Sequence, residues 1–185
     1  TGDHPEAKPV FDLDAITLLE AIRAICAGND MAGNPLKGSP SFLAGAVANP
    51  GAADLEKEVG RMEQKIDAGA GFFQTQAVYD PDAFSDFMSR VQRFGVPVLA
   101  GFIMLKSAAM ARRFNAHVPG IDVPEELIQE LEQAEDRAAT SVEIAARIIS
   151  KIKPLCQGVH LIAVGWEAKI PQVLESAGLA ESRGS

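Results

Sequence analysis

Two glutamines stand at the end of a short apolar segment, where their amide groups could bind a flat nitrogen heterocycle. The segment Phe72-Phe73 is followed at once by Gln74, Thr75 and Gln76. A carboxamide offers two donors and one carbonyl acceptor, which suits the edge of such a ring. Because side chains alternate along a strand, Gln74 and Gln76 are predicted to share one face. Alternation does not choose between them, and a glutamine that bonds a neighbouring loop is the structural alternative.

Three charged side chains precede this segment at helical spacing. Glu58, Arg61 and Lys65 are three and four residues apart, so they are predicted to share one face of a helix. A solvated row of salt bridges is the simplest interpretation, although a lysine there could also offset a phosphate charge. Asn49, which precedes Pro50, could either form a turn or contact a ligand.

Short apolar strands alternate with amphipathic helices in the chain that carries these residues. Such alternation favours an α/β fold with parallel strands and right-handed crossovers. Strands that are apolar on both faces indicate a sheet covered on both sides. Ligands of such proteins sit at the carboxyl ends of the strands, where Gln74, Gln76 and Asn49 would lie. Strands are predicted at 42–47, 72–76, 98–103 and 159–164, and helices at 16–25, 54–67, 81–94, 107–114, 125–135, 140–152 and 171–177.

The order of elements leaves a doubly wound sheet and a barrel as candidates. A dinucleotide fold is disfavoured because no GxGxxG motif follows any predicted strand. Counting strands and helices favours a barrel from which the first part is missing.

Composition excludes several classes of partner. The chain has 185 residues and a net charge of −8, which disfavours binding to nucleic acid or to an anionic membrane. Its apolar segments are far shorter than the roughly 20 residues that cross a bilayer. Cys26 and Cys156 are predicted to be buried free thiols in a reducing cytoplasm. His4, His117 and His160 are scattered and predict no metal site, and His160 is predicted to be a core histidine.

Several motifs, in one order along the chain, resemble the 5,10-methylenetetrahydrofolate reductases, a family of flavin-dependent (β/α)8 barrels. They are Thr1-Gly2-Asp3, residues 10–14 before Leu18-Leu19, GNDMAGNPLKGSPSFLAGAVANP at 28–50, Glu58 with Arg61 and Lys65, AGAGFFQTQAVYD at 68–80, VLAGFIMLKS at 98–107, VPGIDVP at 118–124 and GVHLIAVG at 158–165. Each motif alone is weak, and their common order and spacing carry the resemblance.

The resemblance implies that residues 1–185 are the C-terminal portion of one TIM-barrel domain, roughly strands four to eight with their helices. Thr1-Gly2-Asp3 would end the fourth strand, so three strands are expected upstream. The family's catalytic glutamate, on its first strand, would also lie there. We therefore expect the chain to belong to a longer, homo-oligomeric protein and to be inactive alone.

The resemblance also assigns roles near the flavin. Asp3 would act catalytically beside the flavin N1–C2 edge and the folate, where its negative charge disfavours the anionic reduced flavin. Gly2, Asn49, Glu58, Arg61 and Lys65 would bind the cofactor, which is expected to be FAD with FMN as the alternative. Gln64 stands where some relatives have arginine, so one phosphate contact is expected to be weaker.

For the substrate, the resemblance assigns Gln76, Asp3 and Ser107 to methylenetetrahydrofolate. Lys106-Ser107 would lie in the folate-proximal loop, although Met104 and Ala109 depart from the family there. Trp166 is a candidate replacement for the missing aromatic contact. The implied reaction reduces methylenetetrahydrofolate to methyltetrahydrofolate with NAD(P)H or a redox partner protein. A pterin-dependent methyltransferase barrel and a non-catalytic barrel subunit paired with a redox protein are the alternatives.

Overall fold

Four parallel strands form a single sheet in which neighbours in space are also neighbours in the chain. The computed structural model describes Glu6, Lys8 and residues 10–179. The sheet order is β1-β2-β3-β4, and all three pairings are parallel. The strands are β1 (Gly45–Ala48), β2 (Phe72–Ala77), β3 (Val98–Ile103) and β4 (Gly158–Ile162).

Helices fill every connection between the strands, as the alternation predicts. Several helices start at an aspartate whose carboxylate accepts backbone N–H groups of the first turn, which explains their sharp beginnings. None of the described helices is long and apolar enough to pass through a bilayer. The helices are α1 (Ala15–Cys26), α2 (Leu55–Ala68), α3 (Pro81–Val91), α4 (Ala108–His117), α5 (Glu125–Gln133), α6 (Arg137–Ile152) and α7 (Ile170–Ser176), with short 3-10 turns η1 (Gln92–Phe94), η2 (Lys153–Leu155) and η3 (Glu167–Lys169).

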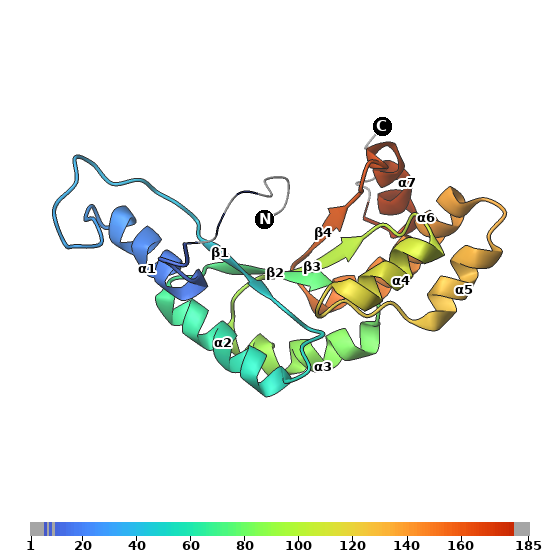
Figure 1. The fold of residues 1–185 in the computed structure, drawn as a ribbon, viewed down its shortest axis with the longest axis horizontal. Coiled ribbons are helices and arrows are strands. Elements are labelled where there is room, and N and C mark those ends of the chain that lie inside the picture. Colours follow the sequence, from blue (N-terminus) through green and yellow to red (C-terminus); the bar gives the residue numbers. More distant parts are fainter. Residues whose placement is uncertain (1–5, 7, 9, 180–185) are drawn as a thin grey trace.

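The two faces of the sheet differ in how well they are covered. Phe73, Ala100 and Phe102 are fully buried on the face that packs against the helices. The opposite face is half-buried or open, and its Val47 and Ile162 are 56% and 37% exposed. Figure 1 shows α2 and α3 along the lower side of the strands. Among the described residues, the prediction that the strands are covered on both faces is therefore wrong.

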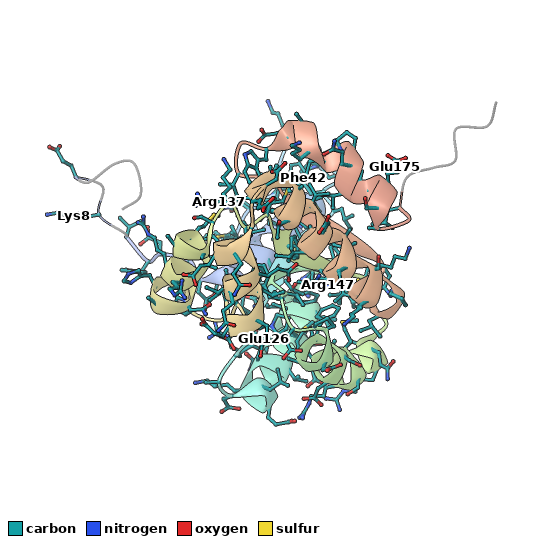
Figure 2. The ribbon with its side chains drawn as sticks, turned by 90° about the vertical axis from the view of Figure 1, so that its right-hand side faces the viewer. Lys8, Phe42, Glu126, Arg137, Arg147 and Glu175 are labelled. Atoms are coloured by element: carbon teal, nitrogen blue, oxygen red, sulfur yellow. The ribbon has the colours of Figure 1, made fainter. Side chains whose placement is uncertain are left out.

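Charged side chains pair between neighbouring helices on the surface. Arg147 of α6, labelled in Figure 2, pairs with Glu130 of α5 at 2.6 Å. Arg112 of α4 pairs with Glu125 and Glu132 of α5. These exposed pairs contribute little stability each, so the apolar layer beneath them carries most of the folding energy.

Several predictions need correction. The first strand begins at Gly45 and not at position 42, because Phe42 and Leu43 are exposed and do not join the sheet. His160 lies on the open face in register with Gly101, half-buried, and is not a core residue. The cysteines are free, as predicted, but they are half-buried.

Candidate functional site

The carboxyl end of β2 contains a bulge that redirects its last residues. Gln74 lies opposite Leu99, but Ala77 lies opposite Gly101, so β2 uses one more residue than β3 over this stretch. A bulge bends its strand and re-aims side chains, and bulges are enriched beside functional sites. The extra residue falls within the stretch that holds Gln76.

Gly101 and Thr75 hold this bulge in place. The Gly101 N–H donates to Thr75 Oγ1 at 2.9 Å, and the Thr75 hydroxyl donates to the Gln76 carbonyl at 2.7 Å. A Cβ atom at Gly101 would lie 2.4 Å from the Thr75 carbonyl oxygen. Only glycine therefore allows β3 to approach the bulged backbone. Sequence reasoning missed this role, although a glycine inside an apolar strand is a known sign of a bulge or a close backbone approach.

The two glutamine amides remain available for a ligand. Gln74 and Gln76 are half-buried, whereas Phe73, Thr75 and Ala77 are buried, in agreement with the prediction that the glutamines share a face. Within the described residues, neither amide forms a hydrogen bond. The structural alternative, a glutamine bonded to a neighbouring loop, therefore has no support in this part of the chain.

Lys65 is buried against the sheet and is not part of a solvated row. Its Nζ donates to the Val47 carbonyl at 2.6 Å, and the residue is only 7% exposed. Burial lowers the pKa of Lys65, and the nearby Glu58 carboxylate partly restores it. The three charged residues share a face of α2, as predicted, but Arg61 is exposed whereas Lys65 is buried, so they do not form a solvated row.

Glu58 and Asn49 also bond the backbone at the end of β1. The Glu58 carboxylate accepts the Asn49 N–H at 2.9 Å, and Asn49 Oδ1 accepts the Gly51 N–H at 3.1 Å. The Asn49 side chain packs closely against Gly120, where an added Cβ would lie 2.0 Å from Asn49 Nδ2. Asn49 therefore forms a turn, which is one of the two roles predicted for it, and it packs against the loop around Gly120.

A small cavity lies beside the ends of β1 and β2. Its volume is about 220 Å³, and it is lined by residues 50–52, 77–80, 83, 84, 120 and 122. In its wall Tyr79 is buried and donates to the Ile103 carbonyl at 2.8 Å, and burial raises the pKa of its phenol. Tyr79 therefore stays neutral and ties the end of β2 to β3.

The loops after β3 and β4 bring a cation and an aromatic ring together. Lys106 Nζ lies 5.4 Å from the centre of the Trp166 ring. Val164, just before this tryptophan, has a φ of 53°, which is strained for a β-branched residue. Ser107 is the N-cap of α4, and its hydroxyl accepts the Met110 N–H at 3.2 Å.

Two predicted site residues, Gly2 and Asp3, lie outside the described residues, as does His4. Within the described part of the chain, no group of three or more histidine, cysteine, aspartate or glutamate side chains could hold a metal ion. The structure brings Gln76 and the Lys106 loop to the carboxyl ends of neighbouring strands. Gln74 lies in the middle of β2, opposite Leu99 near the start of β3, and Lys65 and Glu58 bond β1 and its end.

The model of one protein family matches almost the whole chain. This family is described as methylenetetrahydrofolate reductase, and it matches residues 2–178. Methylenetetrahydrofolate reductase 2 of Schizosaccharomyces pombe is 24% identical over 70% of this chain and 22% of its own length. A probable methylenetetrahydrofolate reductase (NADPH) of Caenorhabditis elegans is 23% identical over 99% and 28%, and methylenetetrahydrofolate reductase (NADH) 1 of Zea mays is 25% identical over 97% and 32%.

The chain thus spans about a third or less of the length of these curated relatives. A solved structure is also similar: an uncharacterized protein from Clostridium thermocellum that binds two copies of 5-methyl-5,6,7,8-tetrahydrofolic acid. Its TM-score is 0.56 at 25% sequence identity, and the match covers 74% of this chain and 52% of that one.

Proposed function

The chain belongs to the methylenetetrahydrofolate reductase family, and on this basis we propose that it forms the folate-binding part of such a reductase. The reaction would reduce 5,10-methylenetetrahydrofolate to 5-methyltetrahydrofolate. The observation that carries the proposal is the glutamine amide at the bulged end of β2, that of Gln76, which bonds no side chain or backbone group of the described residues. The other strand-end groups of β2 and its neighbour, such as the Tyr79 hydroxyl, already bond the backbone.

The sheet is proposed to be part of a (β/α)8 barrel. Its strands follow chain order, whereas a doubly wound sheet reverses order at a switch point. The helix-covered face and the open face correspond to the outside and the interior of a barrel wall. In this proposal the strands are roughly the last four of the barrel, and residues 1–185 form the C-terminal portion of a single domain.

Gln76 is proposed to orient the pterin ring of the folate. Its amide can donate to ring nitrogen or carbonyl atoms and accept from an amino group at the same edge. The similar Clostridium protein binds 5-methyltetrahydrofolate, which supports a folate ligand for this fold. Gln74 is half-buried on the same strand and serves as the matched comparison.

A flavin is the expected hydride carrier, since the family is generally flavin-dependent. We propose FAD, with NAD(P)H or a redox protein as the donor, and a homo-oligomer in the cytoplasm. The three residues that the resemblance assigns to the cofactor do not form a phosphate site: Lys65 bonds Val47, Glu58 bonds Asn49, and of the three only Arg61 is exposed. The described residues therefore do not account for the flavin phosphates.

This difference favours a second candidate, a folate-binding barrel subunit that pairs with a redox protein and binds no flavin. In both candidates the chain binds folate. The candidates differ in whether the full protein takes up FAD.

The test is a titration of the protein with 5-methyltetrahydrofolate, followed through the fluorescence of Trp166, its single tryptophan. Gln76→Ala is expected to weaken binding about 10-fold, the effect of one lost ligand hydrogen bond, and Gln74→Ala less than about 3-fold. Absence of folate binding by the wild-type protein, confirmed by calorimetry, would refute the proposal. FAD absorbance that survives gel filtration would separate the reductase from the second candidate.

A further inference from the structure

We propose that Lys106, held over the ring of Trp166, is the group that receives the anionic glutamate tail of the folate. This inference rests on the proposed folate site and adds to it a specific recognition of the carboxylate end of the ligand. It concerns the loops after β3 and β4, next to the strand that carries Gln76.

The Lys106 ammonium lies between the Trp166 ring and the backbone of the loop after β4. Lys106 Nζ lies 5.4 Å from the centre of the Trp166 ring, and a Cβ at Gly165 would lie 3.2 Å from it. Gly165 and Val164 both have positive φ, of 81° and 53°. A β-branched residue in this conformation is strained, and such strain concentrates where a structure positions groups for a ligand.

The ammonium has an unused capacity to bind an anion. Among the described residues, no carboxylate lies within salt-bridge distance of Lys106, whereas Arg90, Arg112 and Arg147 all pair with carboxylates. A cation over an aromatic face keeps its free N–H groups directed away from the ring. Holding a lysine in place beforehand also removes part of the entropy that binding would otherwise cost.

The arrangement suits an elongated ligand with a ring at one end and a negative charge at the other. Lys106 follows β3, the neighbour of β2, and its ammonium lies at the ring of Trp166, which follows β4, the next strand along. A ring held at Gln76 would need a linker to reach Lys106. Tetrahydrofolate has this shape, because an aminobenzoyl group joins its pterin to its glutamate.

The experiment compares 5-methyltetrahydrofolate with 6-methyltetrahydropterin, which lacks the aminobenzoyl-glutamate tail, by calorimetry on the full chain. Lys106→Gln is expected to weaken the folate at least about 10-fold and the pterin less than 2-fold. Lys106→Arg should recover most of the folate affinity. Lys151→Gln, which neutralises an exposed lysine of α6, is the control and should change neither affinity.

The outcomes separate the two levels of the proposal. Equal loss for both ligands, or no loss for either, would refute the role of Lys106 while leaving the folate site intact. If the wild-type chain binds neither ligand, the proposed function fails together with this inference. Raising the salt concentration provides a second measurement: it should weaken folate binding by the wild type more than by Lys106→Gln, because screening acts on the ion pair.

Discussion

Replacing Gly101 with alanine tests whether the bulge in β2 is built into the sheet. The new Cβ would lie 2.4 Å from the Thr75 carbonyl oxygen and 3.1 Å from the Gln76 carbonyl oxygen. The first distance is about 1 Å shorter than the 3.4 Å at which ordinary contacts begin. Because both opposing atoms belong to the backbone, no side-chain rotation can relieve the overlap.

The expected cost is about 3 kcal/mol, the upper end of the usual penalty for overpacking. An alanine in a strand would otherwise gain about 0.5–1 kcal/mol over glycine, so the predicted change has the opposite sign. Urea unfolding followed by circular dichroism measures the free energy of unfolding. Displacement of the bulge should also weaken 5-methyltetrahydrofolate binding, because Gln76 lies on the displaced backbone.

Gly60→Ala is the matched control, since a Cβ at this position of α2 meets no atom within 4 Å. We expect it to stabilise the protein by about 0.5–1 kcal/mol, the difference in helix propensity. If Gly101→Ala has the same urea unfolding midpoint as the wild type, the close approach of β3 to the bulge does not restrict the residue at this position. If both variants are equally destabilised, the loss is a general effect of the substitution.

Two further substitutions test contacts that hold the strand ends. Thr75→Val removes the acceptor of the buried Gly101 N–H and should cost about 1–3 kcal/mol in urea unfolding. Thr75→Ser keeps the hydroxyl, and an equal loss in this variant would assign the effect to packing. Lys65→Met tests the buried ammonium. Because burial lowers its folded pKa below 10.5, the charged lysine costs stability below that pKa, and the cost fades as pH approaches 10.5. The wild type should therefore gain stability relative to Lys65→Met between pH 7 and 10.5, and a stability difference that stays constant over this range would contradict the prediction.

The elements could be predicted from sequence wherever a local signal marks their ends. The helix predicted at 54–67 is α2 at Leu55–Ala68, because Asp54 caps its start and Gly69 adopts a left-handed conformation at its end. The strand predicted at 98–103 is β3 with the same bounds. The start of the first strand was wrong because Phe42 is apolar but exposed, and apolar character alone does not show which residues find a partner strand.

The sequence did not allow a similar prediction of which polar side chains bond the protein itself and which remain available for a ligand. Lys65 on α2 and Gln76 on β2 are both polar residues that the resemblance assigns to a ligand. In the structure the Lys65 ammonium bonds Val47, while the side-chain amide of Gln76 bonds no described residue. Residue type and spacing do not show which of the two side chains finds a partner within the protein. That depends on distances across the sheet, which only the assembled strands define.

The difference between polar groups that bond the protein and those that do not indicates which part of the sheet is open to a ligand. At β1 the polar groups are used by the fold itself, since Glu58 and Lys65 both bond the backbone there. From β2 to β4 the amide of Gln76 and the ammonium of Lys106 remain without a hydrogen-bond or carboxylate partner among the described residues. Neither group is among the buried side-chain atoms that lack a partner in the described part of the chain, so both can bond water when no ligand is present. A ligand that spans β2 to β4 would only replace that water, whereas a ligand centred on β1 would first have to break the bonds of Glu58 and Lys65.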